Sequence, residues 1–556
     1  MNEEWVVGVG GSSHDFSVAL MHGLDVKVAI ESERLSRIKH GQALWYEDPV
    51  RAAIEYCADA AGIKRSDIAT AVTGDLIPYR VRAYCGDLPM VIYGHHLCHA
   101  ASAYMMVPSD IRTAIIVYDG FGSTIDTSQA AGMPVSRRET FSFYQARDAK
   151  LELLGTTLGE GFAEHTNFSN GSTNSIGYLY EMVTTLLGFH FMDSGKTMGL
   201  AAWGTPKLLD ALHAYTTLGP GFDDCFLFDP FRGFEGDARR FLHSENDSFQ
   251  ARADLAASIQ ELLTETLLHC YSLIEDLEFS VLLLSGGCAL NSVANGVLAR
   301  RLPAHRSLLI PPHASDSGQA LGALWLYARS RESGPFEMTF NGSPMVPSIS
   351  RPGRTYSRSE VQNAANGVYP QVACISSEMS AGQLAERIAG GDIVGVFNGA
   401  SEFGPRALGG RSVLADPRDA LVRERINRQI KHREPFRPLA PMILARHFDE
   451  YFWPLAAKDY FMLTVAQANE RCIQRAPAVV HIDGGARVQV VDDDGDPFLV
   501  ALLERFHELT GVPIVLNTSF NRRGEPIVET PAEAFKAFIA MELDGLYADG
   551  AYYVRT

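Results

Sequence analysis

The sequence has few cysteines and no closely spaced pair of them. Its eight cysteines are scattered over 556 residues without a Cys-x-x-Cys motif, so we predict neither a disulfide framework nor a zinc ribbon. No apolar run approaches the roughly 18 residues that cross a bilayer, and the opening Met-Asn-Glu-Glu lacks the basic start of a signal peptide. We therefore expect a protein of the reducing cytoplasm with no membrane partner.

Positive charge is also scarce. The chain has 48 Lys and Arg against 66 Asp and Glu, a net charge of −18, which argues against general binding of nucleic acid. A chain of 556 residues is too long for one core, so we expect at least two domains. The stretch 334–359 is rich in Pro, Gly and Ser, and we place the domains at 1–345 and 359–556 with a linker at 346–358.

Two histidines four residues apart are the most informative feature of the N-terminal half. His95 and His99 lie in a stretch whose Ala-rich continuation favours a helix, so both imidazoles can project from one face toward a single metal ion. A β-branched run at 113–118 ends in Asp119, at the strand end where open α/β sheets bind ligands. Such a set suits iron, manganese or zinc better than calcium or magnesium. The alternative is a helix whose histidines are merely half-buried.

The tripeptide Asp-Ser-Gly occurs twice before an apolar segment, at 193–195 and at 316–318. Helix capping would explain both, and we expect Asp193 to be a cap. Asp316 follows a predicted strand at 307–310 and is our preferred distant carboxylate for the metal site. Cys98, three residues after His95, ranks below it as a ligand.

Glycine turns follow two of the predicted strands. The strand at 281–284 runs into Ser285-Gly286-Gly287 before a predicted helix, where backbone amides can meet a nucleotide or phosphate. It matches neither a P-loop nor Gly-x-Gly-x-x-Gly, so by itself it is a weak signal. His14 follows the turn at 10–13, for which a plain hairpin is the alternative. Lys39 lies in a basic loop that could equally be solvated surface.

Positive charge is concentrated in one window of this acidic chain. Residues 406–437 contain nine Lys or Arg and four acids, a net of +5 (9 − 4). We expect the part at 419–429 to be an exposed helix with salt bridges. The parts around Arg406 and at 431–438 have no helical period, and planar guanidinium groups suit phosphate oxygens. The strand ending at 515–521 carries polar side chains that suit ribose or phosphate recognition, although turns use the same residues.

Four blocks together resemble the NodU/CmcH family of O-carbamoyltransferases. They are His-His-x-x-His-Ala-Ala-Ser-Ala at 95–103, Ser-Gly-Gly-Cys-Ala-Leu-Asn at 285–291, Glu-Phe-Gly-Pro-Arg-Ala-Leu-Gly at 402–409 and Asn-Thr-Ser-Phe-Asn at 517–521. The resemblance covers nearly the whole chain. It implies an α/β protein with an N-terminal domain of the actin-like ATPase (ASKHA, threonylcarbamoyl-transferase-like) fold and a C-terminal YrdC-like domain.

The resemblance also implies a reaction. Family members form carbamoyladenylate from ATP, with Mg²⁺, and carbamoyl phosphate in the C-terminal domain, and the N-terminal domain transfers the carbamoyl group to a hydroxyl with the help of Fe²⁺ or another divalent transition metal. Carried over by motif, the metal ligands are His95, His99, Asp119 and Asp316, the carbamoyladenylate-binding residues are Gly286, Gly287 and Asn291, and the residues for carbamoyl phosphate and ATP are Arg406, Lys431, Arg437, Arg487, Ser519 and Asn521. His14 is our candidate to take the acceptor's proton, and Lys39 is our candidate to contact the carbamoyl or phosphate group.

The acceptor is not named by any motif. We expect a specialised metabolite, such as a polyketide, macrolide or amino sugar in antibiotic biosynthesis. Aromatic residues could line its pocket, although we expect most of them in the core: Phe141, Phe143, Tyr144, Phe162, Phe168, Tyr178, Phe189 and Phe191. Two other functions are a tRNA threonylcarbamoyl-modifying enzyme and a non-catalytic nucleotide-binding scaffold. The oligomeric state stays open, with a homodimer as one option.

Overall fold

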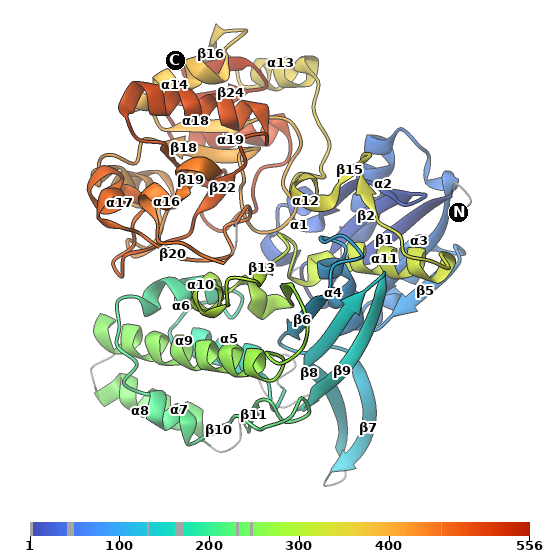
Figure 1. Cartoon of the computed structure of the whole chain (residues 1–556). Helices are drawn as coiled ribbons and strands as arrows, with labels where there is room; N and C mark the ends of the chain where they lie inside the picture. Colours follow the sequence, from blue (N-terminus) through green and yellow to red (C-terminus); the bar gives the residue numbers. More distant parts are fainter. Residues whose placement is uncertain are drawn as a thin grey trace. The chain divides into compact units, whose positions relative to one another are not determined.

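The chain forms two compact units, each built from two separate segments. The computed structural model describes residues 4–41, 49–130, 133–161, 172–229, 233–244, 248–456 and 459–556 (Figure 1). The first unit comprises Met1–Ser12 and Ala69–Met338, and the second comprises Ser13–Ile68 and Thr339–Thr556. The division groups residues 13–68 with the C-terminal part. The predicted domain limits at 345 and 359 stay a prediction.

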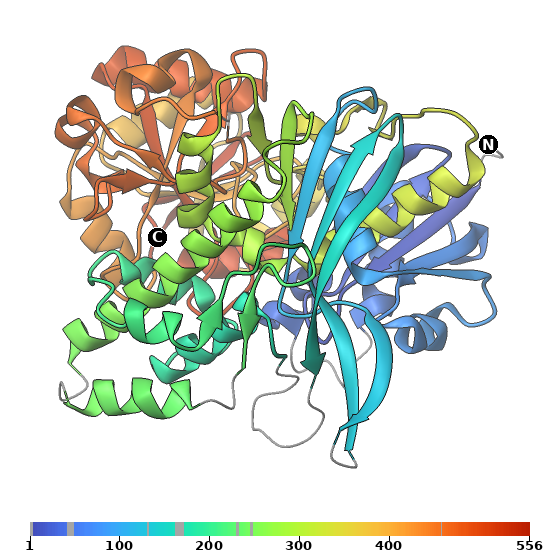
Figure 2. The same cartoon turned by 60° about the horizontal axis from the view of Figure 1, so that its bottom comes forward.

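The first unit contains a six-stranded sheet whose order is β13-β12-β6-β8-β7, with β9 beside β8. The strands are β6 (Thr113–Tyr118), β7 (Thr124–Ala130), β8 (Met133–Arg147), β9 (Lys150–Gly161), β12 (Val281–Ser285) and β13 (Ser307–Leu309). All six residues of β6 are buried, which confirms the buried strand predicted at 113–118. It pairs in parallel with β12 and antiparallel with β8. Figure 2 shows β8 and β9 side by side as two long strands.

Helices α4 (His95–Tyr104) and α11 (Gln319–Arg331) pack closely in this unit. A Cβ atom at Gly322 of α11 would lie 1.9 Å from the carbonyl oxygen of Cys98 in α4, so only glycine permits this approach. The long helix α9 (Phe249–Ser272) lies beside α10 (Ser292–Arg301) and α5 (Ile176–Leu186) (Figure 1). The other elements are β1 (Trp5–Gly10), β4 (Ile68–Gly74), α3 (Pro78–Cys85), β5 (Met90–Tyr93), α6 (Ser194–Ala201), α7 (Leu209–His213), β10 (Thr216–Thr217), β11 (Leu227–Phe228) and α8 (Phe234–Ser244).

The second unit contains an eight-stranded sheet in the order β16-β25-β24-β17-β18-β23-β19-β22. Its strands are β16 (Val372–Ser376), β17 (Val394–Phe397), β18 (Arg411–Ala415), β19 (Ala440–Leu444), β22 (Gln489–Val491), β23 (Ile514–Ser519), β24 (Gly545–Ala548) and β25 (Ala551–Arg555). Helices α14 (Ala381–Ala389) and α18 (Pro497–Thr510) enclose one apolar core with this sheet, and α13 (Arg358–Asn366) and α19 (Pro531–Ala540) enclose another. Helices α13, α14 and α19 each begin with a capping box, which supplies acceptors for their first amides.

The first segment of the second unit carries strands β2 (Ser17–His22) and β3 (Asp25–Glu31) and helices α1 (Ser32–Ser36) and α2 (Pro49–Ala61). Strand β3 pairs in parallel with β14 (Thr339–Phe340), which in turn pairs with β15 (Ser343–Pro344). Shorter helices of the unit are α12 (Met345–Ser348), α15 (Leu421–Glu424), α16 (Phe448–Tyr451) and α17 (Glu470–Arg475), and β20 (Ala466–Gln467) pairs with β21 (Gly485–Ala486).

Buried polar contacts join the two segments of the second unit. The Arg34 guanidinium is fully buried, lies 3.0 Å from Glu31 Oε2 and donates to the carbonyl of Gly404 at 2.6 Å. The Tyr56 hydroxyl donates to Glu529 Oε1 at 2.6 Å. A buried charge without its partner is strongly destabilising, so the segment 13–68 is an integral part of this unit.

The structure confirms the α/β class and most of the elements predicted from sequence. The strands predicted at 113–118, 281–284 and 307–310 and the strand predicted to end at 515–521 all form. The helix predicted at 419–429 is α15 followed by a π-helical segment, Arg425–Ile430, with a salt bridge between Arg428 and Glu424. The prediction for Asp193 is wrong, because its side chain makes no capping hydrogen bond and pairs with Lys196 at 2.7 Å.

Candidate active-site residues

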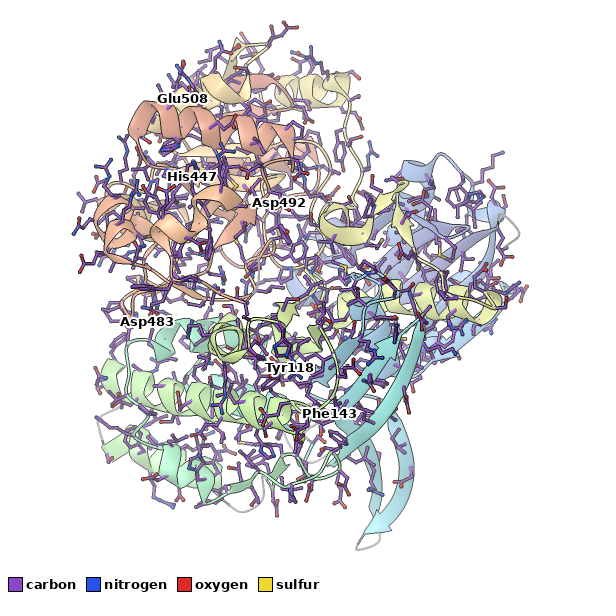
Figure 3. The ribbon with its side chains drawn as sticks, in the orientation of Figure 1. Tyr118, Phe143, His447, Asp483, Asp492 and Glu508 are labelled. Carbon is purple, nitrogen blue, oxygen red and sulfur yellow. The ribbon has the colours of Figure 1, made fainter. Side chains whose placement is uncertain are left out.

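The four residues predicted as metal ligands come together in the first unit. His95 and His99 lie on the first turns of α4, and the His95 amide donates to the Ser123 hydroxyl at 2.7 Å. Tyr118, labelled in Figure 3, is the last residue of β6, and Asp119 follows it directly. Asp316 opens a short 3-10 turn just before α11. We call His95, His99, Asp119 and Asp316 the metal group.

The spacing of these four side chains fits a transition-metal ion. His95 Nε2 lies 3.3 Å from Asp119 Oδ2 and 3.5 Å from Asp316 Oδ1, and His99 Nε2 lies 3.2 and 3.3 Å from the same two oxygens. Ligand atoms bound about 2.1 Å from a tetrahedral ion are separated by about 3.4 Å. The four nitrogen–oxygen distances therefore match those around a bound ion, and all four ligand atoms lie within 4.8 Å of one another. Two nitrogens and two oxygens suit iron, manganese or zinc.

The carboxylates of the metal group shift the pKa values of its imidazoles. Burial alone would lower the pKa of His95, but Asp316 and Asp119 outweigh it and raise the value to about 10. Burial would likewise lower the pKa of His99, but the same two carboxylates outweigh it and raise this pKa. Burial and Asp316 would raise the pKa of Asp119, yet the two histidines lower it overall. Without an ion the two imidazoles therefore hold protons opposite the two carboxylates, and a cation that binds here displaces those protons.

Two neighbours of the metal group take no part in it. The Nδ1 atom of His96 lies 2.8 Å from the hydroxyl of Ser142, so this ring points elsewhere, as predicted. Cys98 is fully buried and is not one of the four clustered ligands, so Asp316 is the better candidate of the two.

The predicted carbamoyladenylate segment lies directly against the metal group. Strand β12 ends at Ser285, a 3-10 turn covers Gly287–Leu290 and α10 follows. The Gly287 amide donates to Asp119 Oδ1 at 3.2 Å. Gly286 has a φ of 91°, and a Cβ there would lie 2.3 Å from the carbonyl oxygen of Tyr118. The Asn291 amide is engaged with Gln260 and caps α10 by accepting from the Ala294 amide.

A group of five cationic side chains forms in the second unit. It contains the predicted Arg406, Lys431, Arg437 and Arg487, and Arg433 in addition, and we call it the cationic cluster. Burial and Arg437 lower the pKa of Arg406 to about 10 and that of Arg433 to about 9. Burial and three arginines of the cluster lower the pKa of Arg487 further. These groups therefore repel one another at close range.

The counter-charge within this cluster is small. Asp459 is the acid that acts on both Arg406 and Arg487, but its carboxylate also accepts hydrogen bonds from the Phe461 amide at 2.9 Å and from the Thr464 hydroxyl at 2.7 Å. The buried Nε atoms of Arg406 and Arg487 have no hydrogen-bond partner among the residues that the structure describes. Asp483, labelled in Figure 3, marks the loop that leads to Arg487. Two buried guanidinium donors without a partner, among further positive charges, suit an anion of high charge.

Lys431 connects the cluster to the two polar residues predicted to bind ATP. Its ammonium group donates to the backbone carbonyls of Ser519 and Asn521 and to the Asn521 Oδ1 atom at 3.0 Å. The Ser519 hydroxyl donates to Asn521 Oδ1 at 2.6 Å. Burial, two arginines of the cluster and Lys39 lower the pKa of Lys431. The structure thus brings these predicted residues together.

The loop that carries Arg406 is organised by a buried carboxylate. Glu402 Oε1 accepts hydrogen bonds from the amides of Leu408, Gly410 and Arg411 at 2.8, 2.7 and 3.0 Å. Burial would raise the pKa of Glu402, but nearby arginines and these amides lower it. The motif Glu-Phe-Gly-Pro-Arg therefore begins with the residue that shapes the turn.

His14 and Lys39, the two predicted catalytic residues, both belong to the second unit. His14 Nδ1 lies 3.3 Å from Asp15 Oδ2, and His40 Nδ1 lies 3.0 Å from Asp15 Oδ1. Asp15 and His40 both adopt positive φ angles, 52° and 59°. Such backbone strain in non-glycine residues is frequent at functional sites. The roles of His14 and Lys39 stay predictions.

The aromatic residues considered for an acceptor pocket divide into three groups. Phe141 and Phe143 are fully buried and Tyr144 is nearly so, as expected for core residues. Tyr178, Phe189 and Phe191 are partly exposed. Phe162 and Phe168 lie outside the described residues.

Family models identify the chain. The model described as "Carbamoyltransferase N-terminus" matches residues 76–325, and the model described as "Carbamoyltransferase C-terminus" matches residues 385–555. Together they span most of the sequence. The chain belongs to the carbamoyltransferase family. It is therefore a transferase, and the resemblance to the NodU/CmcH family is confirmed.

Several named proteins are similar in sequence to this carbamoyltransferase. The nodulation protein NolNO of Sinorhizobium fredii is 31% identical over 98% of this chain and 79% of its own length. The 3'-hydroxymethylcephem-O-carbamoyltransferase of Amycolatopsis lactamdurans is 33% identical over 60% of each chain. Among solved structures, full-length HypF in a phosphate- and nucleotide-bound form covers 60% of this chain and 56% of its own with 14% identity and a TM-score of 0.43, a likeness too weak to carry an argument.

Some functional candidates of this carbamoyltransferase were not singled out from sequence. Arg433 was counted in the basic window without a role, and its position in the cationic cluster depends on the fold. Asp15 and Gln319 carried no motif of their own. Among the described residues, no helix has both the length and the apolar character needed to cross a bilayer.

Proposed function

We propose that this carbamoyltransferase activates carbamoyl phosphate with ATP and transfers the carbamoyl group to a hydroxyl of a small specialised metabolite. In the first reaction, carbamoyl phosphate, water and ATP, which is accompanied by Mg²⁺, give carbamoyladenylate, pyrophosphate and phosphate: water releases phosphate from carbamoyl phosphate, and the resulting carbamate oxygen displaces pyrophosphate from ATP. In the second, the acceptor oxygen bonds to the carbamoyl carbon, the bond to AMP breaks and the hydroxyl proton is released. The named cephem O-carbamoyltransferase among the relatives supports a hydroxyl as the acceptor.

The observation that carries the proposal is the cationic cluster. Burial and other members of the cluster lower the pKa of four of its five groups, and two of the groups have buried Nε donors without a hydrogen-bond partner among the described residues. Such an arrangement is unfavourable by itself and becomes favourable when a polyanion supplies the opposite charge. The first reaction brings two polyanions, ATP and carbamoyl phosphate, to one place.

The metal group is the proposed site of transfer. His95, His99, Asp119 and Asp316 would hold Fe²⁺ or another divalent transition metal, which when bound acts as a Lewis acid. The Gly287 amide donates to Asp119 Oδ1 and so helps to orient this carboxylate. In the second unit, His14 stays our candidate base, because its ring lies against Asp15 and a carboxylate partner strengthens an imidazole as a base.

The experiment that tests the first reaction is exchange of labelled pyrophosphate into ATP. We expect exchange that depends on carbamoyl phosphate, and we expect Arg406→Met to lose at least about 100-fold because one fixed cation is removed from the transition state. The matched control is Arg428→Met in the same unit, which removes an exposed arginine paired with Glu424. Absence of exchange in the wild type, or equal exchange in both variants, would refute the proposal.

A further inference from the structure

Two buried amide side chains hold the backbone that follows Arg406. Asn517 of β23 is 1% exposed and Gln489 of β22 is 3% exposed. Asn517 Nδ2 donates to the carbonyl oxygen of Ala407 at 3.1 Å, and Gln489 Nε2 donates to that of Leu408 at 3.0 Å. The two amides also bond to each other, from Asn517 Nδ2 to Gln489 Oε1 at 2.7 Å. We call Gln489 and Asn517 the amide pair.

The orientation of both amides is fixed by their neighbours, because the hydrogen-bond partners distinguish the oxygen of an amide from its nitrogen. If the Asn517 amide were turned over, its oxygen would face the Ala407 carbonyl oxygen and Gln489 Oε1. If the Gln489 amide were turned over, its oxygen would face the Leu408 carbonyl oxygen. Both amides therefore donate to the loop that carries Arg406.

The sheet brings the two members of the amide pair to the same face. Strand β19 lies between β23 and β22, and Figure 1 shows β19 beside β22. Asn517 is opposite Ala440, and Gln489 is opposite Met442. Opposed residues share a face, and so do alternate residues of one strand. The amide pair therefore spans the face of β19, where the single methyl group of Ala440 leaves room for it.

The amide pair connects three chain segments that carry predicted ligand residues. Arg406 immediately precedes the two carbonyls that accept from the pair, Arg487 lies two residues before Gln489, and Ser519 lies two residues after Asn517. The buried Nε atom of Arg406 has no hydrogen-bond partner among the residues that the structure describes. The direction of this guanidinium group therefore depends on how the backbone beside it is held.

We propose that Gln489 and Asn517 are positioning residues that set Arg406 against Arg487 and Ser519 for binding of the phosphate groups of ATP and pyrophosphate. This inference rests on the cationic cluster of the proposed function. A displacement of about 1 Å in a group that positions a reactant can cost about 100-fold. Loss of the bonds to the two loop carbonyls is therefore expected to weaken anion binding although every cation is still present.

The test measures the affinity of the full chain for pyrophosphate by calorimetry in the wild type, Gln489→Met, Arg406→Met and the double variant. Gln489→Met keeps the side-chain length and loses the donor, and we expect about 10- to 100-fold weaker binding. In the Arg406→Met background the same substitution should change the affinity by less than about threefold. Asn517→Leu should behave in the same way. The matched control is Asn469→Leu, which removes a half-buried amide of the same unit that bonds to the Glu450 carbonyl and caps α17, and it should keep the wild-type affinity.

The outcomes separate this inference from the proposal beneath it. If the wild type binds pyrophosphate no better than Arg406→Met does, the cationic cluster fails as an anion site and the inference falls with it. If Arg406→Met binds weakly while Gln489→Met and Asn517→Leu keep the wild-type affinity, the inference alone is overturned. Equal losses from Gln489→Met with and without Arg406 also overturn it, because such an effect does not act through Arg406.

A milder variant covers the case in which neither substitution of the amide pair folds. Asn517→Ser keeps one donor and replaces them in the same comparison. A loss of affinity that occurs only while Arg406 is present supports the inference. An unchanged affinity, or equal losses with and without Arg406, overturns it.

Discussion

Replacement of Arg406 by methionine should stabilise this carbamoyltransferase in the absence of ligand while it removes activity. Arg406 is half-buried among like charges, and burial together with Arg437 lowers its pKa from 12.5 to about 10. A guanidinium whose pKa is lower in the folded state than in the unfolded state opposes folding at every pH at which it stays charged. Methionine keeps an unbranched apolar stem and removes that charge.

The size of the effect follows from the pKa shift. The lowering of this pKa from 12.5 to about 10 corresponds to about 3.5 kcal/mol at roughly 1.4 kcal/mol per pKa unit. This is an upper limit, because the side chain is partly solvated and the arginine stem also contributes packing. We therefore expect Arg406→Met to raise the free energy of unfolding by about 1 kcal/mol, in the range of other substitutions that trade activity for stability.

The assay is urea unfolding at pH 7 with and without pyrophosphate. The wild type should gain stability from pyrophosphate, by about 2.7 kcal/mol at a concentration 100 times the Kd, and Arg406→Met should gain much less. Arg428→Met, at an exposed position, should change the unfolding free energy by less than about 0.5 kcal/mol. The reasoning would be refuted if ligand-free Arg406→Met were less stable than the wild type and still gained as much stability from pyrophosphate. That result would show that repulsion within the cationic cluster does not lower the free energy of unfolding.

Two further predictions concern other parts of the chain. Gly286→Ala should destabilise the first unit by about 3 kcal/mol or more in thermal unfolding, because its φ is 91° and its Cβ would meet the Tyr118 carbonyl at 2.3 Å. Gly195→Ala in α6, where a Cβ meets nothing within 4 Å, should be neutral or stabilising, and equal losses in both would contradict the argument. Asp15 raises the pKa of His40 against the effect of burial, so the stabilisation from this pair is complete below pH about 6.5 and is lost as pH rises through the higher folded-state value. Urea unfolding between pH 6 and 9 should show a steeper decline in the wild type than in Asp15→Asn, in which the raised pKa values of His95 and His99 still act, while equal slopes in the two proteins would exclude it.

Local patterns in the sequence predicted the metal group well. His95 and His99 share a helix face because their spacing is four residues, and Asp119 follows a strand that was recognisable from its β-branched run. Asp316 was chosen from its place after a strand, and the structure brings it to 3.3 Å from His99. Each of these inferences required only the side-chain repeat or the end of a single helix or strand.

The partners of these residues could not be predicted in the same way. Gln319 contacts His95 across 224 residues of sequence, and nothing in the residues around 319 distinguishes it from an ordinary first residue of an apolar helix. Strand β3 pairs with β14 more than 300 residues later, which is why residues 13–68 lie in a unit that sequence order alone does not suggest. The error at Asp193 has a local cause, because Lys196 one turn later competes for its carboxylate.

The buried contact between Arg34 and the carbonyl of Gly404 limits how genes of this family can be recombined. A chimaera that exchanges only the part after residue 346 would keep one parent's Arg34 and receive the other parent's loop, and the same holds for Tyr56 and Glu529. Exchanges that carry residues 13–68 along with the C-terminal part preserve these pairs. Chimaeras should therefore fold only when residues 13–68 and the C-terminal part come from the same parent.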